Sequence, residues 1–260
     1  MRHARAFGFA GLAVLAVAAA AAIAQTTVTP VPEAAPVESA PLDAAAAAAA
    51  LATAKGGDPQ AGATKAGACA ACHGLDGNAT DPTLYPRLAG QSERYIARQL
   101  TLFKTGERMN PIMQPFAAAL SAQDMRDIGA YFATQKSGAG IADDTVIASG
   151  PNQGLKFYEV GQKLYRSGDT TRGIPACMAC HGGAGTGNPG PAYPHVGGQQ
   201  SWYTARRLQE YRAGTTTEKE PALFQVMSSV AKSLTDEEIQ SLSSYMQGLH
   251  ARTEVAASKR

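Results

Sequence analysis

The sequence predicts an all-α protein built from two similar domains in tandem. The pentapeptide C-x-x-C-H occurs twice, at 69–73 and 177–181. The residues that follow each copy are duplicated as well. In both halves, apolar side chains recur at the three- and four-residue spacing of amphipathic helices. A duplicated helical unit is the simplest account of these observations.

The segment 1–24 has the pattern of a secretory signal peptide. Arg2 and Arg5 precede the apolar stretch 6–23, and the tripeptide Ala-Ile-Ala at 22–24 matches a small-residue cleavage site. The arginines are not adjacent, which argues against a twin-arginine signal, and no cysteine near the cleavage site offers a lipid anchor. We therefore expect export to the periplasm. An uncleaved segment would instead form a membrane tether.

Residues 25–54 are rich in alanine and proline. Four prolines and only three acidic residues lie between 26 and 54, and alanine fills 44–50. A segment of this composition cannot bury a core of its own. We predict a disordered linker, in part extended and in part helical.

Residues 55–137 are predicted to form the first helical domain. N-cap residues mark its expected helix starts: Asp58 followed by Pro59, then Ser92, then Ser121 with Asp124 three residues later. The first helix should lead through Ala71 into the first motif, and the third should end by Gly138. The expected buried faces carry Ile96, Leu100 and Phe103, then Met125, Ile128 and Phe132.

The second half repeats this order after a polar, glycine-rich interdomain linker at 138–153. The second domain is predicted at 154–252, with a tail at 253–260. Its expected helices are Gly154 to Ser167, one opened by Ser201, and one capped by Thr235 with Glu238. Each domain has only about 90 residues and is marginal without a further core component. We therefore expect the apoprotein to be poorly folded.

The repeated motif is the pattern of covalent haem attachment. Its two thiols can form thioether bonds to the porphyrin, and the following imidazole can take one axial position on the iron. The cysteines concerned are all four in the chain: Cys69, Cys72, Cys177 and Cys180. The axial histidines are then His73 and His181. The motif predicts two covalently attached haem c groups.

The cysteine pairs have three other interpretations. A thioredoxin-like redox pair belongs in a βαβ context and has no use for the following histidine. A structural zinc site needs partner ligands at closer spacing than Cys72 and Cys177 provide. Two ordinary disulfides remain an alternative in an oxidising compartment.

The duplication extends well beyond the motif. A shift of 108 relates pairs that include Cys69 and Cys177, Gln91 and Gln199, Tyr95 and Tyr203, and Arg98 and Arg206. Later the shift becomes 114, which relates Leu120 to Leu234 and Tyr131 to Tyr245. The second copy therefore contains six extra residues between Leu208 and Leu234, where we expect a longer loop.

The sixth iron ligand in each half is predicted by elimination among the methionines. Met1 starts the chain, Met178 lies inside a motif, and Met125 and Met246 fall on apolar helical faces. Met113 and Met227 each lie eight residues before a matched helix start. We assign Met113 and Met227 as axial ligands, and Met109 remains a rival in the first half.

Charge limits the kinds of partner. The chain carries 23 basic and 21 acidic residues, and removal of a signal containing Arg2 and Arg5 would leave the two signs balanced. The sequence shows no clustered basic surface of the kind that binds nucleic acid. We therefore predict no DNA or other nucleic-acid partner.

The motifs resemble those of the dihaem cytochromes c4. The resemblance covers residues 57–250 and is carried by CAACHGLDGN, YPRLAGQSERYIARQL and LSAQDMRDIGAYF in the first half. The second half carries IPACMACHG, YPHVGGQQSWYTARRL and LTDEEIQSLSSYMQGLH. The departures are the alanine- and proline-rich segment and His195, which stands where the first half has Arg87.

The resemblance implies two tandem class I cytochrome c domains, each with His and Met axial ligands, related by an approximate twofold axis. It also implies that the carbonyls of Pro86 and Pro194 accept hydrogen bonds from the ligand histidines, although each Tyr-Pro pair is equally compatible with a simple turn. Haem propionates are candidate partners of Arg94, Arg98, Arg206 and Arg207, and a solvated helix face is the alternative. His195 and His250 are expected at the surface.

A haem iron held by His and Met changes oxidation state without binding a substrate, and Met ligation raises its potential. We therefore expect an electron-transfer protein and no catalytic residues. The expected role is that of a one-electron carrier between a quinol-oxidising complex and a terminal oxidase or reductase. The alternatives are a haem enzyme, either peroxidase-like or a sulfur-compound dehydrogenase, and a permanent cytochrome subunit of a dehydrogenase complex.

Overall fold

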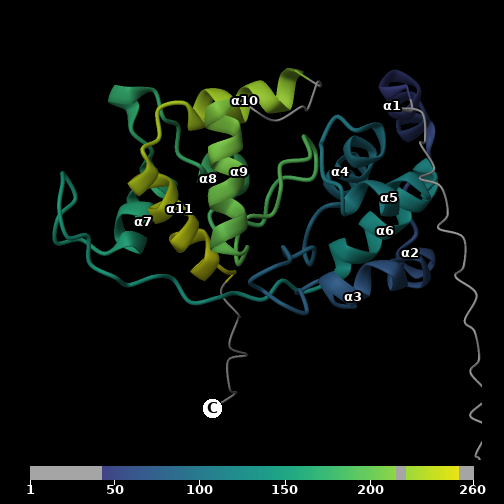
Figure 1. The fold of residues 1–260 in the computed structure, drawn as a ribbon, viewed down its shortest axis with the longest axis horizontal. Coiled ribbons are helices and arrows are strands. Elements are labelled where there is room, and N and C mark those ends of the chain that lie inside the picture. Colours follow the sequence, from purple (N-terminus) through teal and green to yellow (C-terminus); the bar gives the residue numbers. More distant parts are fainter. Residues whose placement is uncertain (1–42, 215–220, 252–260) are drawn as a thin grey trace, which may run out of the picture. The chain divides into compact units, whose positions relative to one another are not determined.

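A computed structural model describes residues 43–214 and 221–251 of the chain. The predicted signal peptide, residues 25–42 of the predicted linker and the tail at 253–260 lie outside the described residues. Secondary structure in the described ranges is helical, apart from three isolated β-bridges (Figure 1). This agrees with the predicted all-α class. None of the helices in these ranges combines the length and the apolar character that crossing a membrane requires.

From residue 43 to residue 137, the structure contains six α-helices, which are labelled in Figure 1. They are α1 (Ala44–Thr53), α2 (Pro59–Lys65), α3 (Ala70–His73), α4 (Glu93–Thr105), α5 (Met113–Ala118) and α6 (Ala122–Thr134). A 3₁₀ turn at Ala66–Cys69 joins α2 to α3. The predicted helix from Asp58 to Ala71 is therefore divided in three, and α6 ends at Thr134, before the expected limit at Gly138.

The second half contains five α-helices in the described ranges. They are α7 (Phe157–Ser167), α8 (Met178–His181), α9 (Ser201–Ala213), α10 (Pro221–Ala231) and α11 (Asp236–Gly248). A 3₁₀ turn at Thr170–Arg172 lies between α7 and α8. The six extra residues expected between Leu208 and Leu234 fall in a region that includes helix α10.

The predicted caps at Asp58, Ser92, Ser121 and Thr235 are confirmed. The Asp58 carboxylate accepts from the backbone N–H groups of the first turn of α2. Ser92 caps α4, and reciprocal capping boxes open α6 and α11. Ser201 opens α9 as expected: it is the first residue of that helix, with Gln200 at the N-cap position and no side-chain capping bond. These caps satisfy backbone donors that would otherwise lack partners at the helix starts.

Helix α1 lies within the segment for which the sequence suggested a largely disordered linker. The alanine run favours a helix because alanine has the highest helix propensity. Asp43 caps the helix, and Leu51 packs against the first core. Residues 44–53 are therefore helical and contact the first domain.

Each half has its own apolar core. In the first, α6 packs against both α2 and α4, and the buried side chains include Ile96, Leu100, Phe103, Met125, Ile128 and Phe132. In the second, α11 packs against α7 and α9, and the core includes Val160, Leu164, Tyr165, Leu208, Ile239, Leu242 and Met246. The buried faces predicted for the first half are confirmed.

The predicted interdomain linker at 138–153 contains no helix and follows the second domain closely. Gly140 donates its N–H to the carbonyl of Gln247 at 2.9 Å, and Asp143 donates its N–H to the hydroxyl of Ser244 at 2.7 Å. These bonds attach the linker to α11.

Candidate cofactor-binding sites

The first C-x-x-C-H motif runs from the 3₁₀ turn into the short helix α3. Gly74 ends α3 with φ +75°, a conformation that L side chains rarely adopt. His73 is buried, and its Nδ1 lies 2.9 Å from the carbonyl oxygen of Pro86. Nδ1 therefore donates to this carbonyl, and the lone pair of Nε2 remains available for a metal.

The second motif repeats this arrangement in α8. Gly182 ends the helix with φ +80°, and buried His181 places Nδ1 3.0 Å from the carbonyl oxygen of Pro194. The predicted hydrogen bonds from the two histidines to proline carbonyls are thus confirmed. In each half the Tyr-Pro turn also places the tyrosine ring about 6 Å from the imidazole, Tyr85 at 6.1 Å and Tyr193 at 6.2 Å.

Burial sets the protonation state of both motifs. It lowers the pKa of His73 and of His181, so the imidazoles are neutral, as metal ligation requires. Burial also raises the pKa of the Cys69 thiol, and that of Cys177 to about 11. All four cysteines lie in the described ranges, and none is in a disulfide.

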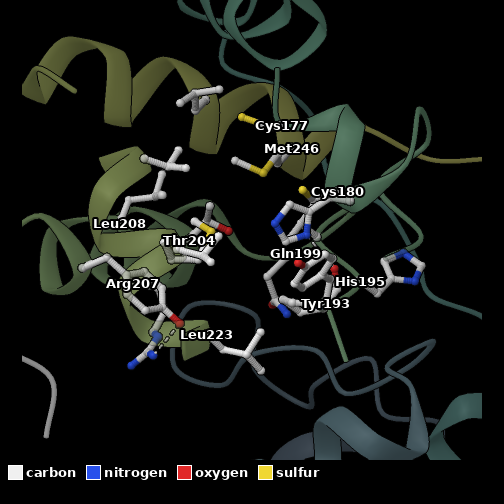
Figure 2. Close-up of a pocket in the computed structure, with 18 of the residues that line it drawn as sticks. Cys177, Cys180, Tyr193, His195, Gln199, Thr204, Arg207, Leu208, Leu223 and Met246 are labelled. Atoms are coloured by element: carbon white, nitrogen blue, oxygen red, sulfur yellow. Dashed lines mark hydrogen bonds between the residues drawn. The ribbon is translucent and has the colours of Figure 1, made fainter. Parts of the chain in front are cut away.

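A large apolar cavity opens beside the second motif (Figure 2). Its empty space is about 1330 Å³, part of which is open to solvent. Cys177, Cys180 and His181 line it, with Leu208 and Thr204 of α9 across from the cysteines. The first domain also contributes to the lining, through Gln91, Tyr95 and Arg98.

The methionines differ in their surroundings. Met227, in α10, lines the cavity beside the second motif and packs, like Cys177, against the second core. Met113, the first residue of α5, packs with Cys69 against the first core. Met109 is 78% exposed. Met246 is buried in the second core as predicted, but it also lines the cavity, which its helical spacing did not indicate.

Two side chains that the sequence analysis did not single out hold the motif backbones. The hydroxyl of Thr80 donates to the carbonyl of Cys72 at 2.9 Å. The hydroxyl of Tyr165 donates to the carbonyl of Gly182 at 2.6 Å. Because these contacts differ between the two copies, the duplicated sequence does not predict them.

The expectation that His195 lies at the surface is wrong. His195 is half-buried, its Nδ1 lies 3.3 Å from the carbonyl oxygen of Gly90, and burial lowers its pKa. Gly90 of the first domain contacts this ring, and local sequence does not encode a contact between segments so far apart. His250 is exposed, as expected.

The four candidate arginines have different environments. Arg94 donates to the carbonyl of Gly190, and Arg98 lines the cavity beside the second motif. Arg206 is partly exposed and stacks over the ring of Trp202. Arg207 is buried and pairs with Glu210 at 2.7 Å. Only Arg98 and Arg207 line the cavity.

Two glutamines join the halves in a reciprocal way. Gln91 accepts from the backbone N–H of His195 at 2.9 Å and donates to its carbonyl at 2.7 Å. Gln199 accepts from the backbone N–H of Arg87 at 2.9 Å and donates to its carbonyl at 3.0 Å. Because a shift of 108 relates Gln91 to Gln199 and Arg87 to His195, these contacts have the approximate twofold symmetry implied by the resemblance.

The residues present fit a covalently held haem in each half. In each half, two thiols lie next to a neutral imidazole whose Nε2 is available. In the second half, the sulfur-containing side chain of Met227 also lines the apolar cavity. Two such helical domains in one chain define a dihaem c-type cytochrome.

Comparison with known proteins agrees. The family model described as Cytochrome c matches residues 59–136 and 158–250. Cytochrome c4 of Pseudomonas aeruginosa is 41% identical over 182 residues, covering 70% of this chain and 84% of that protein. The thiosulfate dehydrogenase electron acceptor of Stutzerimonas stutzeri is 36% identical over 178 residues, covering 68% and 77%.

Among solved structures, reduced recombinant cytochrome c4 from Pseudomonas stutzeri matches with a TM-score of 0.66 and 39% identity, covering 75% of this chain and all of that one. The chain belongs to the dihaem cytochrome c4 family. It accordingly carries two covalently attached haem c groups and is an electron-transfer protein with redox protein partners.

Proposed function

We propose that this protein is a periplasmic carrier that takes single electrons from a quinol-oxidising complex and delivers them to a terminal oxidase or reductase. The observation that carries the proposal is that His181 and Met227 both line the cavity beside the second motif. Two protein ligands would fill both axial positions of the iron. No position would then remain for a substrate, which favours a carrier over a haem enzyme.

We propose His73 with Met113, and His181 with Met227, as the axial pairs, and Cys69, Cys72, Cys177 and Cys180 as the attachment residues. Met113 and Met227 each pack against the same core as the first cysteine of their motif. The 78% exposure of Met109 argues against it as the ligand.

The bound haem supplies a reversible one-electron couple. The chain supplies burial and orientation. The proline carbonyls hold the two imidazoles in place through Nδ1, and the apolar cavity lining limits water at the second site. Thioether ligation and an apolar surrounding both favour a high reduction potential, which suits the oxidising end of a respiratory chain.

The domain limits 55–137 and 154–252 and cleavage after residue 24 are part of the same proposal. A secretory signal would deliver the chain to the compartment where its partners operate. N-terminal sequencing of the native protein tests the cleavage. Detection of residues 1–24 in the membrane fraction would contradict it and indicate a tethered carrier.

The test of the carrier role is a reconstituted electron-transfer assay. The purified holoprotein should be reduced by a quinol-oxidising complex and reoxidised by a terminal oxidase, with two one-electron equivalents per chain. Reduced protein that binds carbon monoxide at either iron would instead indicate an open axial position and an enzyme.

A second candidate donor is thiosulfate dehydrogenase. The relative of Stutzerimonas stutzeri named thiosulfate dehydrogenase electron acceptor supports it, at 36% identity. Stopped-flow mixing of the oxidised protein with each reduced donor separates the two candidates. Faster reduction by thiosulfate dehydrogenase than by the quinol-oxidising complex would favour the second.

A further inference from the structure

The peptide groups that accept hydrogen bonds from His73 and His181 are each hydrogen-bonded at both ends, and the two ends bond to different domains. The peptide between Pro86 and Arg87 accepts at its carbonyl from His73 Nδ1, 2.9 Å away. The N–H of the same peptide donates to Oε1 of Gln199, also at 2.9 Å. Gln199 therefore lies one peptide group away from the axial histidine of the other domain.

The second domain has the mirror arrangement. The peptide between Pro194 and His195 accepts at its carbonyl from His181 Nδ1 at 3.0 Å. Its N–H donates to Oε1 of Gln91 in the first domain at 2.9 Å. Gln91 is 4% exposed and Gln199 is 6% exposed, so neither bond competes freely with water. We call each chain of glutamine, peptide and histidine a crossed relay.

Hydrogen bonds arranged in series polarise one another, and the effect is larger in a buried, low-dielectric setting. When a peptide N–H has an acceptor, its carbonyl oxygen becomes more negative and accepts more strongly. A stronger bond to Nδ1–H makes the imidazole a more basic ligand. A more basic ligand stabilises the oxidised iron and lowers its reduction potential.

We propose that each haem is tuned by a glutamine of the other domain: Gln199 lowers the potential of the first haem, and Gln91 lowers that of the second. Both are positioning residues that act through a peptide group. The inference rests on the proposed ligation of the irons by His73 and His181. The two relays also couple the domains physically. A change in domain packing would move each glutamine away from the peptide N–H of the other domain and so change the reduction potential of that domain's haem.

The alternative is that the glutamines only hold the domains together. Other contacts do so without touching a peptide bonded to an axial histidine. Trp202, for example, donates its Nε1–H to the carbonyl of Pro82 at 2.8 Å. Trp202→Phe is therefore a matched control that removes a contact between the halves and leaves both relays intact.

The experiment compares Gln91→Met, Gln199→Met and Trp202→Phe as full-length holoproteins. Methionine is close to glutamine in shape, but its sulfur accepts a hydrogen bond far more weakly than an amide oxygen and it has no N–H to donate. Proton NMR of ¹⁵N-histidine-labelled reduced protein measures the strength of each Nδ1–H bond directly. Redox titration followed on resonances assigned to each domain gives the two potentials separately.

We expect Gln91→Met to move the Nδ1–H resonance of His181 upfield and to raise the potential of the second haem only. Gln199→Met should move the resonance of His73 and raise the potential of the first haem only. Trp202→Phe should move neither resonance. Equal shifts at both haems, or shifts only at the haem of the mutated domain, would overturn the proposal.

Gln91→Glu serves as a second variant if the methionine variants unfold. It keeps an acceptor oxygen and strengthens it, so the His181 resonance should move downfield, and an unchanged resonance would overturn the proposal. Failure of the proposed ligation has a separate signature, namely a wild-type reduced protein that lacks haem-shifted histidine Nδ1–H resonances. Failure of the crossed relay alone would give a wild-type spectrum typical of His and Met ligation, together with unchanged Nδ1–H resonances in the glutamine variants.

Discussion

The Nη2 of Arg108 donates to the hydroxyl oxygen of Tyr203 at 2.9 Å, joining the end of the α4 region to α9. Arg108 is 9% exposed, also donates to Gln99 at 2.7 Å, and stacks over the ring of Phe103 at 4.6 Å. Within the described residues, no carboxylate forms an ion pair with it. The buried guanidinium of Arg108 is therefore stabilised largely by uncharged hydrogen-bond acceptors, Gln99 and Tyr203.

Removal of one of these acceptors should be costly. Tyr203→Phe leaves one N–H of the buried guanidinium without its partner, and we expect the free energy of unfolding to fall by about 1–3 kcal/mol. Denaturant unfolding of the holoprotein measures it. Tyr158→Phe is the control, because the hydroxyl of Tyr158 forms no hydrogen bond in the described part of the chain. Equal stability of the two variants would contradict the expectation.

Glycine is required where α2 packs against α6 and where α7 packs against α11. A Cβ on Gly62 would overlap the carbonyl oxygen of Asp127 and lie 2.9 Å from Cβ of Tyr131. We predict that Gly62→Ala lowers the free energy of unfolding by about 1–3 kcal/mol, the usual cost of overpacking. Gly67→Ala, which meets no atom within 4 Å, should be nearly neutral.

The same prediction holds for the second domain at Gly161, where a Cβ would overlap the carbonyl oxygen of Ser241 and lie 2.8 Å from Cβ of Tyr245. Gly161→Ala should therefore destabilise the second domain by a similar amount, measured as the loss of its part of the calorimetric transition. A Gly161→Ala protein with an unchanged transition would show that α7 and α11 can separate without cost.

Acid should weaken the first domain through one ion-pair network. The bond to Lys65 and the bonds from Ser121 lower the pKa of Asp124 to about 2. Because the folded pKa lies below the ordinary value of about 3.9, Asp124 contributes stability above pH 4 and loses it as the pH falls toward 2.

Lys65→Met should raise the pKa of Asp124 and lower the free energy of unfolding at pH 7, with a smaller difference near pH 2. A ¹³C-carboxyl NMR titration and unfolding at the two pH values measure both effects. Lys163→Met, at an exposed position of α7, is the control. A pH-independent effect of Lys65→Met would rule out this linkage.

The proposed sixth ligand of the first haem can be tested against its rival. Met113→Ala should abolish the weak long-wavelength Met–iron absorption of that haem and lower its potential, since loss of the thioether removes the ligand that raises it. Met109→Ala should leave both unchanged, because Met109 is 78% exposed. The reverse pattern would make Met109 the ligand.

Removal of the second cofactor should unfold the domain that encloses it. The double variant Cys177→Ala, Cys180→Ala cannot form the thioether bonds, and the apolar cavity beside the second motif would lose the group that fills it. We expect one haem per chain by mass and a loss of helical circular dichroism corresponding to α7–α11. Retained helicity would show that this domain is stable without its haem.

Much of this protein is determined by short stretches of sequence. The spacing of Cys69, Cys72 and His73 predicts that a single porphyrin meets both thiols and the imidazole. The capping box of Ser121 with Asp124 depends on residues three apart, so its position was predictable. Duplication then extended both conclusions to the second half.

Only the tertiary structure decided which residues meet across the chain. It brought His195 beneath the first domain, placed Gln91 and Gln199 on peptides more than 100 positions away, and added Met246 to the cavity lining. These contacts depend on how the helices of one domain present side chains to the other, and no local periodicity encodes that geometry. Spacing along the chain therefore specified the cofactor, whereas packing between distant segments specified its surroundings.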